Sequence, residues 1–337
     1  MQNENIPDDE MRYINQLIDL LRKKMTEDNP DLMRRDAHPK QHGLVKATLS
    51  VAAQLPLELQ QGIFKPGANY KAWVRFSNAS APMQSDYKKD VRGAAIKLLD
   101  IAGEKLAVED GNKTSQDFMF VSMPTFVTRD VKDFAQLVKG ITGNKLYLLF
   151  FLITHPRVLI NTLRSKITIF SPLEARYWST TPYRLGDAVV KYSLIPRATA
   201  TPLPKGVDAK GLDADFLRLN MAKQLTAKEY YFDFAVQLQK DTRAMPIENA
   251  SKDWPEALSP FITLATLTIG AQVFDSPAQN NFGRILSFNP WHGLLEHKPL
   301  GGINRARRLI YSALSAYRHD VNNDAAAEPI DYTIPPI

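Results

Sequence analysis

Hydrophobic positions follow two different periods along this chain. Residues 8–28 carry Ile14, Leu17, Ile18 and Leu21 three or four apart, which predicts an amphipathic helix that Asp8 or Asp9 caps. Several other runs alternate or are rich in β-branched residues and are bounded by Gly, Asn and Pro, which predicts strands over 44–55, 70–76, 94–99, 117–123, 189–195, 230–239 and 262–274. A hairpin is expected at 100–113. So many strands separated by turns indicate an antiparallel sheet or barrel.

Helical patterns fill the middle and the end of the chain. We expect helices over 130–139, 145–166 and 172–178, and a last helix over 303–319. Residues 276–300, rich in Pro, Asn and Gly, are expected to form a long wrapping loop, and 325–337 an extended or frayed tail. The fold class is therefore α+β. We expect an N-terminal helix in 1–30, one domain over 31–322 and a tail over 323–337.

Composition narrows the possible chemistry. The 337 residues include 44% hydrophobic and 23% charged residues, which is typical of a globular domain, and no cysteine, which excludes disulfides and thiolate ligands. The net charge of +6 is spread out, so no nucleic-acid partner is expected. The first ten residues lack a basic and an apolar signal region, so we expect a cytoplasmic protein.

The last predicted helix carries a polar stripe. Arg307 and Tyr311 are four apart and therefore share a face, where the guanidinium would lower the phenol pKa from its usual value of about 10. A phenolate is a known proximal ligand of ferric haem. Arg318 lies on the same stripe, and a buried guanidinium needs a charged partner, which haem would provide. The alternative is an ordinary surface helix with a solvated basic face, which leaves Tyr311 among the arginines unexplained.

Three further motifs share this chain with the Arg-x-x-x-Tyr pair: RRDAHPKQHG at 34–43, WVRFSN at 73–78 and DVRGAAIK at 90–97. In this order they resemble the haem catalase superfamily, most closely its small single-domain members, which include mini-catalase peroxidases and allene oxide synthase. The resemblance runs from Arg34 to His319. It implies a catalase-like antiparallel β-barrel with surrounding helices, a C-terminal haem-ligating helix, and haem b with its iron bound by Tyr311.

The resemblance also implies roles for single residues. His38 matches the distal histidine, which moves a proton between the two peroxide oxygens, and Ser77 matches the serine that orients it. Family residues that contact the haem propionates or the porphyrin match Arg35, Arg75, Arg318, Phe126 and Phe134. Alternatively, His38 and His42 are two ligands of a non-haem metal, although Pro39 disfavours a helical His pair and no third ligand stands at a recognisable spacing.

Two positions depart from the family pattern. Val121 and Ser122 stand where catalases carry an Asn pair, so the amide that binds peroxide is missing; Ser122 is a candidate for a partial substitute. This puts efficient dismutation of hydrogen peroxide in doubt. Ala37 stands before His38, where allene oxide synthases have a threonine, so that branch is not indicated.

Three interpretations are open for the apolar stretches 146–153 and 158–163: the wall of a substrate channel, a face that touches a membrane, or a core helix that covers the barrel. The first two alternatives suit a lipid hydroperoxide and peripheral membrane contact.

We therefore expect a haem-dependent peroxidase that reduces or rearranges hydrogen peroxide or organic, including lipid, hydroperoxides, with an electron donor that the sequence does not identify. The alternatives are a non-catalytic haem carrier or sensor and, more remotely, a lipocalin-like barrel without haem. Small family members lack the extensions that thread catalase tetramers, so a homodimer is expected.

Overall fold

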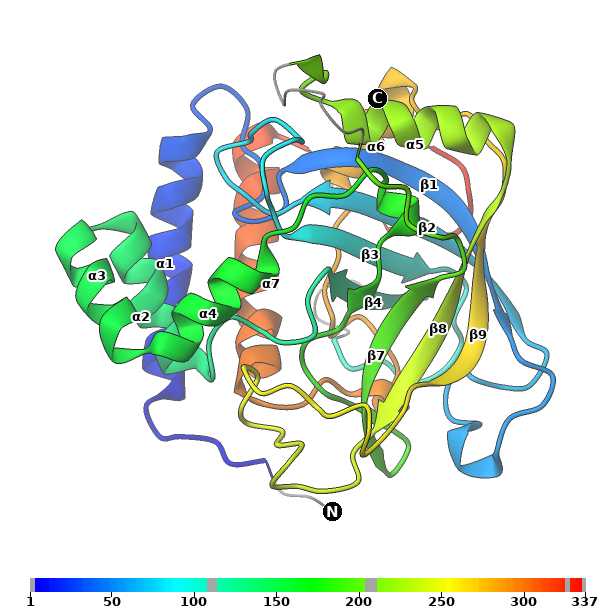
Figure 1. Ribbon diagram of the computed structural model, residues 1–337, viewed down its shortest axis with the longest axis horizontal. Helices are drawn as coiled ribbons and strands as arrows, with labels where there is room; N and C mark the ends of the chain where they lie inside the picture. The colour runs from blue at the N-terminus through cyan, green and yellow to red at the C-terminus, as the bar shows by residue number, and fades with distance from the viewer. Residues whose placement is uncertain (1–3, 108–113, 204–210, 325–327, 335–337) are drawn as a thin grey trace.

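The computed structural model describes residues 4–107, 114–203, 211–324 and 328–334. Within them, one antiparallel sheet has the order β5-β4-β3-β2-β1-β9-β8-β7-β6, and β5 also pairs with β7. Eight strands therefore close into a barrel, with β6 at its margin (Figure 1). This confirms the predicted barrel. The strands are β1 Lys40–Val51, β2 Asn69–Asn78, β3 Arg92–Leu98, β4 Gln116–Val121, β5 Tyr177–Trp178, β6 Tyr183–Leu185, β7 Ala188–Pro196, β8 Tyr230–Leu238 and β9 Ile262–Ile269.

Side chains fill the inside of the barrel, as expected for eight strands. On β2, Val74 and Phe76 belong to the main hydrophobic core, where Phe118 and Phe234 pack edge to face with ring centroids 5.0 Å apart. Because side chains alternate along a strand, Arg75 and Ser77 point to the outside of the barrel. Functional groups on β2 therefore face the helices that surround the barrel.

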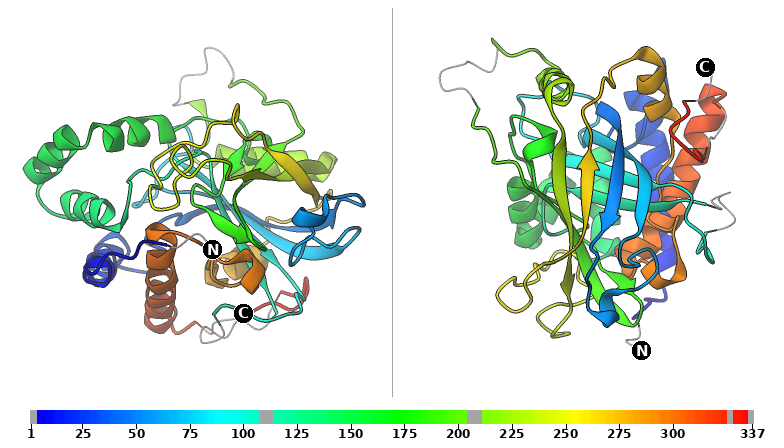
Figure 2. Two further views of the ribbon diagram at one scale, coloured as in Figure 1. Left: turned by 90° about the horizontal axis from the view of Figure 1, so that it is seen from below. Right: turned by 90° about the vertical axis from the view of Figure 1, so that its right-hand side faces the viewer.

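Three helices pack together on that outer side: α1 Glu10–Asp28, α2 Val131–Thr142 and α7 Gly302–Asn322. Their buried faces share one hydrophobic cluster that includes Leu17, Val138 and Ile310. Figure 2 shows α1 and α7 side by side next to the barrel. The first and last predicted helices are thus both present, within a few residues of their expected ends.

Two short helices project from this layer. α3 Lys145–Thr154 and α4 Pro156–Ser165 are joined through His155 and meet at a bend of 103°. Proline lacks the N–H that would continue a helix, so the predicted helix over 145–166 breaks here.

Two sequence expectations were wrong, and one helix was not predicted. Residues 276–300 contain helix α6 Pro277–Ile285, which Ser276 caps by accepting a hydrogen bond from the Gln279 N–H. Residues 172–178 form only a 3₁₀ turn and then β5, because Tyr177 and Trp178 complete the barrel between β4 and β7. Helix α5 Phe216–Ala227 was not predicted.

The described part of the C-terminal tail, residues 328–334, is extended and packs against the barrel. The Glu328 carboxylate lies 2.9 Å from the buried Lys97 ammonium, and the Tyr332 ring packs edge to face on Trp73 at 5.6 Å. The tail is thus tied to the outside of β2 and β3. Of the hairpin expected at 100–113, residues 108–113 lie outside the described part, as do 325–327 and 335–337 of the tail.

Candidate active site

A cavity of about 510 Å³ lies between the outer face of the barrel and helices α1, α2 and α7. That volume is in the usual range for ligand sites. Of the ten residues singled out from the sequence, all but Ser122 line it: Arg35, His38, Arg75, Ser77, Phe126, Phe134, Arg307, Tyr311 and Arg318. The tertiary structure thus brings segments almost three hundred residues apart to one place.

His38 is held in a narrow set of positions. Its backbone adopts φ 59°, and its N–H donates to the Ala79 carbonyl at 3.2 Å. The Arg75 guanidinium donates to the His38 carbonyl at 3.0 Å, and His38 Nδ1 lies 3.0 Å from Ser77 Oγ. Burial, and then the charge of Arg75, lower the imidazole pKa to about 4, so the ring is neutral at pH 7.

Gly93 makes room for this arrangement. It pairs with Ser77 across β3 and β2. A Cβ on residue 93 would lie 2.4 Å from His38 Nδ1 and 2.9 Å from Ser77 Oγ, well inside contact distance. Glycine is therefore the residue that lets the imidazole pack against β3. The sequence motif contained Gly93, but only its contact with His38 reveals why it matters.

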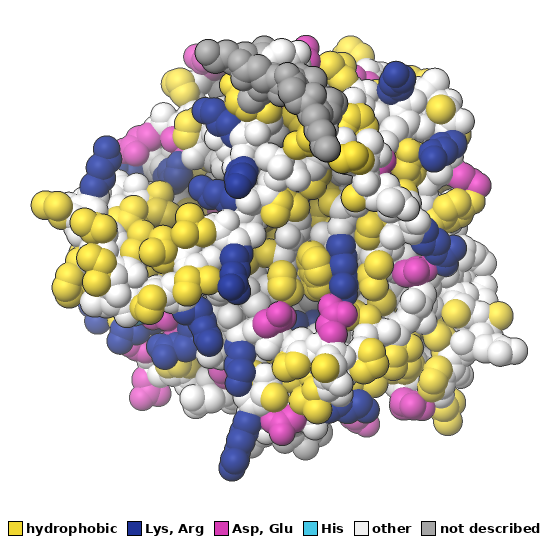
Figure 3. All heavy atoms as spheres, in the orientation of Figure 1, with side chains coloured by type: hydrophobic (Ala, Val, Ile, Leu, Met, Phe, Trp, Pro, Cys, Tyr) yellow, Lys and Arg dark blue, Asp and Glu magenta, His cyan; other side chains and the backbone are white. Residues whose placement is uncertain are grey.

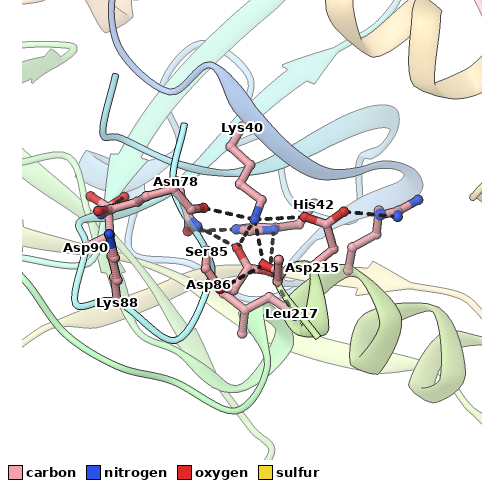
Figure 4. Close-up of polar contacts among 12 residues, drawn as sticks. Lys40, His42, Asn78, Ser85, Asp86, Lys88, Asp90, Asp215 and Leu217 are labelled. Atoms are coloured by element: carbon pink, nitrogen blue, oxygen red, sulfur yellow. Dashed lines mark hydrogen bonds and ion pairs between the residues drawn. The ribbon is translucent and has the colours of Figure 1, made fainter. Parts of the chain in front are cut away.

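A polar network supports the strands that carry Ser77 and Gly93 (Figure 4). Asp86 is fully buried, accepts from Asn78 Nδ2 at 2.8 Å and pairs with the Lys40 ammonium at 2.8 Å. Asn78 Oδ1 in turn accepts from Arg92, which precedes Gly93. The network therefore ties β1, β2 and β3 together directly behind the His38 pocket.

His42 belongs to this network. Its Nε2 lies 2.7 Å from Asn78 Oδ1, and burial lowers its pKa to about 4 despite the nearby Asp86. Among the described residues no group of three or more His, Asp or Glu side chains is placed to hold a metal ion. The alternative of a shared His38–His42 metal site is thus not supported.

Ser122 does not reach the cavity. Its Oγ accepts a hydrogen bond from the Arg92 N–H at 2.9 Å. The neighbouring Val121 lines the cavity instead, because successive strand residues face opposite sides. The expectation that Ser122 stands in for the missing amide was therefore wrong in geometry.

On the opposite wall, Arg307 is fixed beside Tyr311. One Arg307 nitrogen donates to Thr181 Oγ1 at 3.0 Å and to Asn304 Oδ1 at 3.3 Å, and its guanidinium lies 5.5 Å from the Phe126 ring centre. Thr181 also donates to Asn304 at 2.9 Å. Thr181 is a positioning residue that the sequence did not reveal, since it lies in a loop far from α7 in sequence.

The Tyr311 phenol pKa is raised, not lowered. Burial has the largest effect and outweighs the charge of Arg307, while Asp36 raises the pKa further. The sequence expectation considered the arginine without the loss of solvent. A phenolate at Tyr311 therefore needs a further positive charge, as an iron ion would supply.

Three more arginines line the end of the cavity near the C-terminus of α6. Backbone carbonyls at that helix end accept hydrogen bonds from all three. The Arg284 carbonyl accepts from Arg35 at 3.2 Å and from Arg318 at 2.6 Å, and the Gly283 carbonyl accepts from Arg75 at 3.2 Å. Burial, and then repulsion from neighbouring arginines, lowers the pKa values of all three, to about 9 for Arg75 and about 10 for Arg318.

Within the protein, Asp36 and Asp324 offset only part of the charge of these three arginines. A helix end carries only about half a negative charge, and no described carboxylate lies within ion-pair distance of them. The place suits a ligand with carboxylate groups. Together with the Tyr311 phenol, the His38 imidazole and the Phe126 and Phe134 rings, packed edge to face at 5.1 Å, this donor set fits haem.

An antiparallel barrel with the site outside it, against a C-terminal helix, defines a catalase-like protein. Three solved structures share this fold. Catalase A of Saccharomyces cerevisiae matches with a TM-score of 0.70 and 17% identity over 96% of this chain and 68% of that one. A fungal catalase matches with a TM-score of 0.69 and 16% identity over 88% of this chain and 62% of that one. A bacterial catalase matches with a TM-score of 0.67 and 16% identity over 97% of this chain and 65% of that one. The chain thus spans about two thirds of the length of these catalases.

The sequence itself matches no family model. It is 30% identical over 281 residues to the catalase-related peroxidase of Mycolicibacterium paratuberculosis, covering 78% of this chain and 83% of that protein. The chain therefore belongs to the catalase-related peroxidases, oxidoreductases that act on peroxide.

Proposed function

We propose that this protein is a haem-dependent peroxidase with Tyr311 as the proximal ligand and His38 as the distal proton-transfer group. One observation carries the proposal: a phenol, an imidazole and three guanidiniums that have no direct ion-pair partner among the described residues line the same cavity of about 510 Å³. When bound, haem supplies the redox-active iron at which the peroxide O–O bond breaks. Arg35, Arg75 and Arg318 would hold its carboxylates.

His38 performs the proton transfer in this proposal. With its Nδ1–H donated to Ser77 Oγ at 3.0 Å, Nε2 keeps a lone pair at neutral pH, because the pKa is about 4. Nε2 takes the proton from one peroxide oxygen and returns it to the other, which leaves as water or as an alcohol. A haem carrier would have no use for this His–Ser pair, which favours an enzyme over the non-catalytic alternative.

Val121 favours peroxidase turnover over dismutation. This apolar side chain lines the cavity where the family resemblance places a catalase asparagine. We expect Val121→Asn to raise hydrogen peroxide dismutation, measured as oxygen release, relative to oxidation of an electron donor. If wild type and variant both fail to consume any peroxide, the protein is a haem carrier or sensor.

The cavity also favours organic hydroperoxides. The wall that α2 provides is lined by Phe134, Leu137 and Ile141 and carries no charged side chain among the residues that line the cavity. An apolar tail would be removed from water there, which stabilises binding by about 25 cal/mol per Å². A kcat/KM that rises with the chain length of the hydroperoxide would support this preference.

The decisive experiment is the visible spectrum of the haem-reconstituted full chain beside Tyr311→Phe. A tyrosinate-to-iron charge-transfer spectrum that disappears in the variant supports the proposal. Tyr183→Phe is the matched control, because Tyr183 is also buried and electrostatically coupled to Tyr311 and Arg307 but is not among the residues lining the cavity. A chain that takes up no haem, or an unchanged spectrum in Tyr311→Phe, contradicts it.

A further inference from the structure

Helices α3 and α4 expose a large apolar face. On α3, Leu146, Phe150 and Ile153 are 75%, 67% and 68% exposed, and on α4 Leu163 is 67% exposed. Phe151 and Val158 are the buried hydrophobic residues of the pair. Figure 3 shows hydrophobic side chains gathered at the left of the molecule, where Figure 1 places the projecting helix pair. The expectation of a core helix over the barrel was therefore wrong, because a core helix buries such residues.

The charged residues carried by the α3–α4 segment itself are all positive, although the Asp133 carboxylate of α2 lies 3.7 Å from His155 between the two helices. The stretch 134–173 contains five Lys or Arg residues and neither Asp nor Glu. All five are exposed: Lys139, Lys145, Arg157, Arg164 and Lys166. Apolar side chains bordered by cations are the pattern of helices that lie in the interface of an anionic membrane.

The cavity opens beside this face. Ile141 lines the cavity and is also 55% exposed to solvent. Thr162 of α4 and the exposed Lys166, which follows α4, line the cavity as well. A molecule leaving the α3–α4 face therefore meets Ile141 before it reaches Phe134 and the interior. The exposed apolar surface and the cavity therefore adjoin at Ile141, with Thr162 and Lys166 beside it.

Length argues for a helix pair that lies on the membrane. No single helix among the described residues is long and apolar enough to cross a bilayer, although α3 and α4 together pass by length and composition across their 103° bend. Each has ten residues, about 15 Å of helix, against a hydrocarbon core of about 30 Å.

We propose that α3 and α4 dock this protein on an anionic lipid bilayer, with the cavity mouth at the level of the head groups, so that fatty-acyl hydroperoxides enter from the membrane. The substrate part rests on the proposed peroxidase function; the docking part does not. A second copy of the chain is a poorer occupant, because a two-fold contact places the same five cations against themselves.

The test is sedimentation of the full chain with vesicles of phosphatidylglycerol and phosphatidylcholine in equal parts, compared with phosphatidylcholine alone. Leu149→Glu/Phe150→Glu should weaken binding about tenfold or more, since both side chains are more than half exposed and would enter the lipid. Lys145→Gln/Arg164→Gln should weaken binding to anionic vesicles about fivefold for each charge removed. Leu57→Glu is the control, 79% exposed in the loop between β1 and β2.

Binding to anionic vesicles that falls in both double variants and not in Leu57→Glu supports the docking. The docking proposal is overturned if all proteins bind the vesicles equally or if none binds. It is also overturned if the α3–α4 face mediates self-association of the chain and not vesicle binding. The same proteins, loaded with haem, are assayed with hydrogen peroxide in solution and with a fatty-acyl hydroperoxide in vesicles. Loss of only the vesicle activity in the variants supports membrane delivery, whereas wild-type protein without peroxide turnover in either form contradicts the proposed function and leaves the docking result standing.

Discussion

Replacing Gly93 by alanine is the sharpest test of the distal side of the cavity. The new Cβ would lie 2.4 Å from His38 Nδ1, whereas ordinary contacts begin near 3.4 Å, so the imidazole must move by about 1 Å. The Nδ1–Oγ distance to Ser77 is 3.0 Å, and a displacement of that size breaks the hydrogen bond. The ring borders the cavity and can move into it, so the fold should survive.

The expected cost follows from the role of His38. Positioned acid–base catalysis contributes about 10²–10⁴ in rate, and a 1 Å misplacement costs about 10². We therefore expect kcat/KM for peroxide to fall about a hundredfold, or about 2.7 kcal/mol of transition-state stabilisation. The free energy of unfolding should fall by only about 1–3 kcal/mol, the usual range for overpacking.

The assay measures peroxide consumption by the haem-loaded protein, with the Soret absorbance as a measure of haem content. Gly270→Ala is the matched control, because a Cβ there meets nothing within 4 Å. Haem binding should be equal in all three proteins, since Tyr311 and the arginines are unchanged. Wild-type kcat/KM in Gly93→Ala at full haem content would refute the role assigned to the His38–Ser77 pair.

Three further predictions address the haem edge, acid stability and the tail. Arg318→Met should weaken haem binding at least about tenfold, because hydrogen bonds to charged groups contribute about 1.5–3 kcal/mol. The same variant should bind haem dimethyl ester, which lacks the free carboxylates, as well as the wild type does. Equal losses of affinity for both ligands in a titration would count against carboxylate recognition. The free energy of unfolding should fall as the pH drops from about 6.5 towards 3, because burial lowers the pKa to about 4 for His42 and about 3 for His297 in the folded protein. The unfolded chain then binds more protons in this range, and the slope approaches about 1.4 kcal/mol per pH unit for each histidine. Urea midpoints that stay constant between pH 7 and 4.5 would contradict this prediction. Glu328→Gln should lower the free energy of unfolding by about 1–2 kcal/mol without changing haem affinity, because the buried Lys97 keeps Asp117 at 2.9 Å; an unchanged melting temperature would show that the tail contact contributes nothing.

The sequence alone was enough to predict the barrel and both long helices, and nine of the ten site residues that it singled out do line the cavity. Periodicity reports which side of an element is buried, so the strands and α1 and α7 were predictable. The motifs around His38, Arg75, Gly93 and Tyr311 are short stretches of consecutive residues. Their resemblance to the catalase superfamily is therefore visible from the sequence of each motif and from their order along the chain.

What the sequence could not supply depends on contacts between distant segments. Ser122 directly follows β4 and faces away from the cavity, where its Oγ accepts from the Arg92 N–H, and Thr181 reaches Arg307 only because the barrel closes between β5 and β7. The tertiary structure also decided the protonation of Tyr311. A spacing of four shows which charge is near the phenol, whereas the pKa depends on how much water every neighbouring element removes, and that is known only when all of them are packed.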